Sequence, residues 1–173
     1  MRVLTAAAML LLATAFLQPQ EAPRVDAAVN YSHLQVLKGY TISMNGASGS
    51  VAYNFNNWIG LAADIGIYHG YPAQSLTGET FTLGPRLSYR GVERFQPFVQ
   101  ALFGGSHFNA SSGGITGGGL PFANDLGFGA DLALRGHRKF ALRLADDFFG
   151  TRSGGSTTIS NRVSAGIVFR FGR

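Results

Sequence analysis

Residues 51–67 read VAYNFNNWIGLAADIGI. Apolar side chains occupy the odd positions from Val51 to Phe55 and again from Ile59 to Ile67, with small or polar residues between them. A period of two belongs to a β-strand whose two faces meet different surroundings. The short polar interruption between the two runs predicts that they form a β-hairpin.

The same alternation recurs along the rest of the chain, and no helical period is found there. In total it gives eight segments of about ten residues, the length that a tilted strand needs to cross a bilayer. The eight segments are residues 25–32, 50–55, 59–67, 80–89, 98–104, 122–134, 140–148 and 159–171.

The connections between these segments alternate in length. Those around Asn56, Val92 and His137 are short, whereas the others are longer and rich in glycine, serine and threonine. Short periplasmic turns and long extracellular loops are typical of outer-membrane barrels. We therefore predict an all-β fold, an eight-stranded antiparallel up-and-down transmembrane β-barrel with both termini at the periplasmic end. The predicted extracellular loops are residues 37–45, 69–78, 106–120 and 150–157.

Alternation alone does not distinguish a membrane barrel from a soluble barrel such as a lipocalin, so the polar face decides. It holds mostly Gly, Ala, Ser and Thr, with isolated Asp and Arg and no Lys, and only 13% of the 173 residues are charged. Small side chains suit the narrow interior of an eight-stranded barrel. The bulky apolar face is therefore predicted to contact lipid. The chain has no cysteine, which excludes a disulfide scaffold and a thiolate metal site.

Residues 1–22 have the pattern of a secretory signal peptide. Arg2 precedes an apolar run from Val3 to Leu17, which is shorter than the roughly 20 residues of a spanning helix. Cleavage is expected after Ala15 or Ala22, which leaves residues 23–173 as the barrel domain. An N-terminal membrane anchor is the alternative interpretation.

Aromatic side chains gather at the ends of the predicted strands, as they do at the two interfaces of a membrane. If the first strand runs outward, the periplasmic group is Phe55, Trp58, Tyr89, Phe95, Phe140, Phe169 and Phe171. The extracellular group is then Tyr31, Tyr68, Phe81, Phe122 and Phe148.

The predicted inward face carries charges of both signs. An unpaired charge in a narrow interior costs several kcal/mol, so we expect the charges to pair and to plug the barrel. A narrow gated ion path along the same residues is the alternative. The charged residues of this face are Asp26, Asp64, Asp125, Asp131, Asp147, Arg86, Arg143, Arg162 and Arg170. From the centres of the connections, the predicted pairs are Asp131 with Arg143, Asp147 with Arg162, and Asp64 with Arg86.

Three stretches resemble the outer membrane protein A-like family of eight-stranded barrels. They are residues 51–61 (VAYNFNNWIGL), 83–89 (LGPRLSY) and 164–171 (SAGIVFRF), and the likeness covers roughly residues 24–171. The resemblance implies a bacterial outer-membrane protein, often structural or adhesive and in some members a small pore. Two features differ from the family pattern. Gly172 and Arg173 follow the last aromatic residue, and no peptidoglycan-binding domain follows the last strand, so no wall tether is expected.

We therefore expect a structural or surface-interaction role in the bacterial outer membrane, with the loop at 106–120 as the contact surface. A small gated pore or transporter for ions or small solutes is the alternative. The expected partners are outer-membrane lipid and lipopolysaccharide, the barrel-assembly machinery, and a surface ligand bound through the loops. Nucleic acid is not expected, because the basic residues form no surface stripe.

Neither a cofactor nor a metal is expected, because the four histidines lie in or beside different connections. A rim enzyme is not expected either. Ser32–His33 and Ser106–His107 are adjacent in sequence, so on a strand the members of each pair point to opposite faces.

Overall fold

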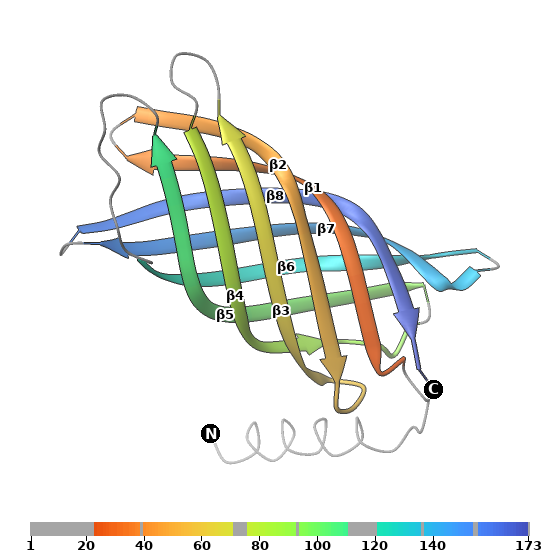
Figure 1. Cartoon of the computed structure of the whole chain (residues 1–173). Coiled ribbons are helices and arrows are strands. Elements are labelled where there is room, and N and C mark those ends of the chain that lie inside the picture. Colours follow the sequence, from red (N-terminus) through yellow and green to blue (C-terminus); the bar gives the residue numbers. More distant parts are fainter. Residues whose placement is uncertain are drawn as a thin grey trace, which may run out of the picture.

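The computed structural model shows a barrel of eight antiparallel strands (Figure 1). The predicted signal peptide at 1–22 lies outside the residues that the structure describes. No helix among the described residues is long and apolar enough to cross a membrane. The described residues are 23–38, 40–70, 76–92, 94–110, 121–135, 137–153 and 156–172.

Each strand pairs with the next along the chain, and the last pairs with the first, so the sheet closes on itself. The closing pair begins with Val25 opposite Phe171. This confirms the predicted fold class. The strands are β1 (Val25–Lys38), β2 (Tyr40–Asn54), β3 (Ile59–Gly70), β4 (Leu76–Ser88), β5 (Phe95–Ala110), β6 (Phe122–Leu134), β7 (His137–Ser153) and β8 (Ser156–Phe171).

The connections confirm one half of the prediction and correct the other. The connections 55–58, 89–94 and 135–136 are short and lie at one end of the barrel, which we call the short-turn end. At the opposite end, the predicted long loops 37–45 and 150–157 are wrong, because the strands continue through most of them. Backbone groups beyond the alternating apolar residues still form hydrogen bonds with the neighbouring strand. The hydrogen-bonded strands are therefore longer than the segments in which apolar and polar side chains alternate. The predicted loops 69–78 and 106–120 fall partly on residues outside the described ranges.

The bulky side chains point outward and the small and charged ones inward. Ile65 and Phe128 are 57% and 51% exposed, whereas Asp64 and Arg143 are 4% and 3% exposed. A soluble barrel has the reverse arrangement, with an apolar interior and a charged exterior. The interior therefore forms the candidate site, and its polar side chains are held by strands on all sides.

Candidate functional site

Two layers of ion pairs and one apolar layer fill the lumen. Inward positions fall on every second residue, so each strand presents its charged residues to the same central space. The charged side chains of this face are buried. Because burial is costly for an unpaired charge, the partners of each residue determine what the lumen does.

Arg162 on β8 is the centre of the layer farther from the short-turn end. Its Nε and Nη2 donate to Oδ2 of Asp147 on neighbouring β7, at 2.9 and 2.7 Å. Its Nη1 donates to Oδ1 of Asp64 at 2.6 Å and to the hydroxyl of Tyr68 at 2.9 Å. Asp64 and Tyr68 lie on β3, which is not adjacent to β8, so this arginine bridges the lumen. The structure thus brings Asp147 and Arg162 together, opposite each other in the register.

Arg143 on β7 organises the layer nearer the short-turn end. It lies opposite Asp131 of β6 and donates to both carboxylate oxygens, from Nε at 2.7 Å and from Nη2 at 2.8 Å. This two-bond geometry is the strong form of an arginine–carboxylate pair. Its remaining Nη1 donates to Oγ of Ser50 at 3.0 Å, and Ser50 lies on β2 across the lumen. A second bridge therefore crosses the barrel here.

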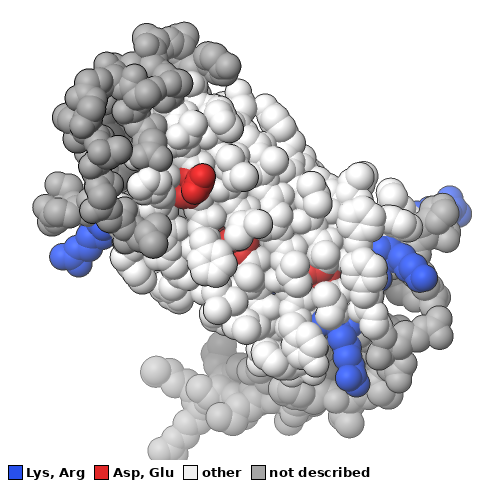
Figure 2. Space-filling model, in the orientation of Figure 1, with Lys and Arg blue, Asp and Glu red and all other residues white. Residues whose placement is uncertain are grey.

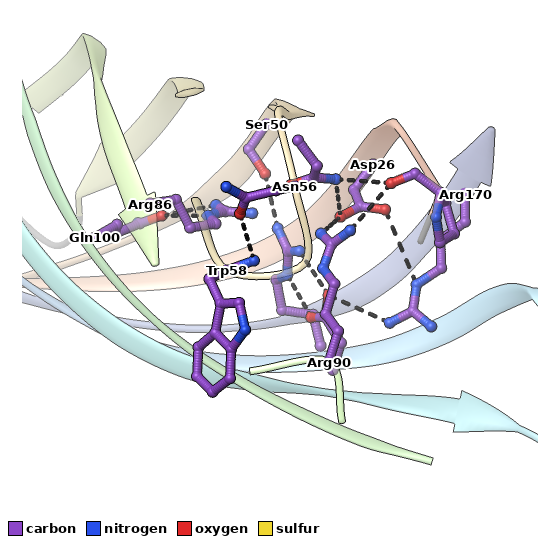
Figure 3. Close-up of polar contacts among 12 residues, drawn as sticks. Asp26, Ser50, Asn56, Trp58, Arg86, Arg90, Gln100 and Arg170 are labelled. Carbon is purple, nitrogen blue, oxygen red and sulfur yellow. Dashed lines mark hydrogen bonds and ion pairs between the residues drawn. The ribbon is translucent and has the colours of Figure 1, made fainter. Parts of the chain in front are cut away.

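Asp26 on β1 forms the last group of ion pairs before the short-turn end. Arg90, just after β4, donates to Asp26 Oδ2, and Asn54 Nδ2 donates to the same oxygen at 3.1 Å. Arg170 on β8 approaches from another side, with 4.0 Å between its Nε and Asp26 Oδ1 (Figure 3). Arg170 also reaches Asp131, with 3.7 Å between Nη2 and Oδ2. Sequence reasoning missed Arg90 as a lumen residue, because it follows the predicted strand at 80–89 and falls in the short connection around Val92.

The predicted pairing of Asp64 with Arg86 is wrong. Asp64 lies opposite Thr82, and Arg86 lies opposite Gly60. Arg86 instead donates through Nε and Nη2 to Oε1 of Gln100, at 3.0 and 2.7 Å (Figure 3). Gln100 in turn donates to Asp147 Oδ1 at 3.0 Å, which links the two layers of ion pairs.

The two layers carry charge of opposite sign. Among the described residues, three carboxylates (Asp64, Asp125 and Asp147) surround the single guanidinium of Arg162. Toward the short-turn end, Asp26 and Asp131 pair with the guanidinium groups of Arg90, Arg143 and Arg170. Arg86, which is bonded to Gln100, adds a fourth buried guanidinium. Asp125 is fully buried and neither of its carboxylate oxygens accepts a hydrogen bond from a described residue. Its nearest cation is Arg162 Nη2, 3.6 Å from Oδ2.

An apolar cap lies in the lumen at the end away from the short turns. We use this name for the buried side chains Leu34, Met44, Tyr68 and Phe149, against which Val36, Ile42, Leu76 and Phe108 pack. The prediction that Tyr68 belongs to the outer aromatic group is wrong. Its ring lies inside, where Gly66 leaves space that a Cβ would fill, and its hydroxyl meets Arg162. The inward parity of these residues was a signal for the cap, but residues 37–45 were interpreted as loop.

The remaining predicted aromatic residues lie on the outer face. Tyr31, Phe55, Phe81, Tyr89, Phe140 and Phe171 are exposed, and Trp58 and Phe169 are half-buried. Several are in ring contact, such as Trp58 with Tyr89 at 4.9 Å between centroids and Phe140 with Phe169 at 5.3 Å. The outer face also holds one half-buried acid on β7, Asp146, whose Oδ1 accepts a hydrogen bond of 2.6 Å from Asn161 Nδ2.

The serine–histidine pairs are separated by the strand as predicted. Ser32 points inward and contacts Ser48 at 2.9 Å between the hydroxyl oxygens, whereas His33 lies outside and contacts Asn45 Oδ1 at 2.7 Å. Ser106 is likewise buried next to an outward His107. Within the described ranges, no group of three or more histidine or acidic residues is arranged to hold a metal ion.

Comparison with solved structures identifies this architecture. Neisserial surface protein A (NspA) superposes with a TM-score of 0.71 at 14% identity, covering 88% of this chain and 100% of that one. The chain folds as an eight-stranded outer-membrane β-barrel. The outer-membrane protein OprG from Pseudomonas aeruginosa matches with a TM-score of 0.57 at 12% identity, over 88% of this chain and 98% of its own. Ail, the attachment invasion locus protein of Yersinia pestis, matches with a TM-score of 0.53 at 16% identity, over 86% and 99%.

No protein-family model and no curated protein matches the chain. An outer-membrane barrel is thus recognised here by its backbone, while its sequence differs at more than four of every five positions from these structures. This is expected of a fold that depends on alternation and small inward residues, because many sequences satisfy that pattern.

Proposed function

We propose that this chain is a non-conducting barrel of the bacterial outer membrane, with a structural role and a surface-contact role at its loops. In the proposed orientation, which follows outer-membrane barrels with short periplasmic turns, the short-turn end faces the periplasm and the apolar cap lies toward the cell exterior. The exposed aromatic residues at the two ends then lie at the two membrane interfaces. Residues 1–22 serve as the leader for export, and the barrel-assembly machinery inserts the chain beside lipid and lipopolysaccharide.

The observation that carries the proposal is the pair of bridges across the lumen. Arg162 reaches from β8 to Asp64 on β3, and Arg143 reaches from β7 to Ser50 on β2. A water-filled path along the axis has to pass both bridges and then the apolar cap. Opening the path means breaking the buried Arg162–Asp64 ion pair and the buried Arg143–Ser50 hydrogen bond, which would leave polar groups without partners in a narrow interior.

The direct test is conductance in a planar lipid bilayer. The folded protein is expected to give no reproducible channels. The variant Asp64→Gly/Tyr68→Gly/Arg143→Gly/Arg162→Gly removes both bridges and part of the apolar cap, and it is expected to conduct. Reproducible channels from the unaltered protein would instead support the small gated pore or transporter.

A contact role at the surface is supported by the fold neighbours and by the loops. Ail is an attachment invasion locus protein, and it has been solved in complex with a heparin analogue, sucrose octasulfate. For this chain we propose residues 106–120 as the contact surface. The first part of this segment, up to Ala110, belongs to β5. Removing residues 111–120 is expected to abolish adhesion of expressing cells while the barrel stays folded. Unchanged adhesion would assign the barrel a structural role alone.

A further inference from the structure

The short-turn end carries a group of exposed cations outside the lumen. We call Arg24, Arg94, Arg135 and Lys139 the basic collar, because they lie where strands begin or end around the barrel. All four side chains are exposed. In Figure 2, most of the blue side chains lie toward the end at which the C-terminus lies in Figure 1, while the middle of the face is white with small patches of red and no blue.

The collar is not neutralised by carboxylates of the described residues. Asp26 and Asp131, the acids nearest this end, are buried in the lumen and paired with arginines there. None of the ion pairs among the described residues involves a collar side chain. In sequence, Arg138 near the start of β7 adds a further cation, and Glu93 is the single acid in the connections at this end, so the positive excess persists.

Three of the four cations lie at the short-turn ends of three neighbouring strands, β5, β6 and β7. Arg94 precedes β5, Arg135 follows β6 and Lys139 lies at the start of β7. The backbone carbonyl of Arg94 accepts a hydrogen bond of 2.9 Å from the amide of Ala133, which places the β4–β5 connection beside the end of β6. Positive charge is therefore concentrated over one arc of the barrel circumference.

The position of the basic collar along the barrel axis, relative to the aromatic residues, indicates which part of the lipid bilayer it contacts. Arg94 directly precedes the exposed Phe95, and Lys139 directly precedes the exposed Phe140. Aromatic side chains of this kind lie at the boundary between hydrocarbon and headgroups. A cation one residue farther out is level with the headgroup phosphates, where arginine and lysine attract anionic lipid.

We infer that the basic collar is a docking surface for anionic glycerophospholipid headgroups in the leaflet that faces the short turns. The inference rests on the membrane location proposed above, and it adds a preference for one class of lipid on one side of the membrane. Arginine suits this partner, because its guanidinium can donate two parallel hydrogen bonds to a phosphate. The recognised chemistry is a headgroup phosphate with no cation beside it, as in phosphatidylglycerol, whereas the phosphate of phosphatidylcholine is balanced by a quaternary ammonium. Inorganic phosphate in solution is likewise an uncompensated anion.

The test uses tryptophan fluorescence to read the lipid composition beside the collar. The chain has one tryptophan, Trp58. The variant Trp58→Phe/Phe95→Trp moves this reporter next to Arg94. The folded protein is placed in nanodiscs containing phosphatidylcholine and phosphatidylglycerol, with brominated acyl chains on one lipid at a time as the quencher. Enrichment of phosphatidylglycerol at the reporter is the expected result, by roughly fivefold or more over its share of the bilayer.

Two variants separate the collar from general lipid contact. Arg94→Gln/Arg135→Gln/Lys139→Gln in the reporter background is expected to reduce the enrichment to about one, that is, no preference. Arg152→Gln, which removes an exposed cation near the opposite end of β7, is the matched control and is expected to leave the enrichment unchanged. Raising the salt to 0.5 M should weaken the preference, because exposed charges are screened.

The remaining outcomes have definite meanings. Loss of the enrichment on adding millimolar inorganic phosphate would overturn the assignment to lipid in favour of a soluble phosphate ligand. Equal enrichment in the triple variant and the unaltered protein would overturn the role of the collar. A chain that shows no heat-modifiable migration and does not enter nanodiscs would overturn the proposed membrane location itself. An inserted barrel without lipid preference would overturn this inference alone.

Discussion

Arg162 shows what a single residue does in this lumen. It holds two carboxylates directly and lies 3.6 Å from a third, and its guanidinium stacks on Phe149 with 4.7 Å to the ring centroid. Replacing Arg162 with methionine leaves three buried carboxylates without a cation. We expect the free energy of unfolding to fall by about 3–5 kcal/mol, measured by urea titration in lipid. Arg152→Met, an exposed control, should change it by less than about 0.5 kcal/mol.

Asp125 is expected to behave in the opposite way. Its carboxylate is surplus to the one guanidinium in its layer and accepts no hydrogen bond from the described residues. Asp125→Asn should therefore raise the free energy of unfolding by about 1 kcal/mol. Asp131→Asn makes the same chemical change but deprives Arg143 of its two-bond partner, so it should lower stability by about 3 kcal/mol or more. Equal effects of the two substitutions would show that the two layers do not differ in charge.

Among the elements, β7 and β8 share a polar contact on their outer face. Asn161→Leu removes the donor to the half-buried Asp146 carboxylate and should cost about 1–3 kcal/mol of stability. Adding Asp146→Leu should more than recover this loss, because this contact point between β7 and β8 on the outer face then becomes apolar. A double-mutant cycle in lipid measures the coupling, and simple additivity of the two changes would contradict it.

The strands themselves were predictable, whereas their lengths and one register were not. Alternation fixes which face a residue occupies, and it placed all eight strands. A slip of two or four residues keeps every side chain on its face, however, so alternation leaves even shifts undetermined. The structure pairs Asp131 with Arg143, but it does so through a register shift between Ala133 and Leu134. Without that shift, the pairing of Leu134 with His137 would place Phe140 opposite Asp131. The longer connection between β3 and β4 allowed an error of four residues, which separated Asp64 from Arg86.

The apolar cap and Tyr68 show a second limit of sequence reasoning. Aromatic enrichment at interfaces favoured an outward Tyr68, while its even position in β3 favoured an inward one. Tyr68 points inward, because its place in the strand dictates the direction of the side chain and Arg162 supplies a hydrogen-bond partner for its hydroxyl. Contacts between distant strands, such as Arg143 with Ser50, required knowledge of closure and shear that no local pattern contains.

For the whole molecule, the closing pair places the two ends of the barrel domain together. Val25 lies opposite Phe171, so a short glycine linker can join residue 172 to residue 24. A chain joined in this way and opened within residues 111–120 is expected to fold, with heat-modifiable migration on gels. Opening it inside β5, between Gln100 and Ala101, should prevent folding, because the cut falls in the ladder. Folding of both chains would show that the β5 pairing is dispensable.

The seam between β1 and β8 also sets the order of events in biogenesis. Until residues 156–171 have been made, the backbone amides of β1 that will meet them have no partner on that side. Unpaired backbone groups at an open strand edge are costly in the hydrocarbon core of a bilayer. The strands therefore cannot insert one at a time, as the helices of helical membrane proteins do. With the export and outer-membrane location proposed above, the chain crosses the aqueous compartment as a complete but unclosed polypeptide. Pairing of β1 with β8 is then the committing step, and any event that delays the sixteen residues of β8 leaves two unpaired strand edges open to aggregation.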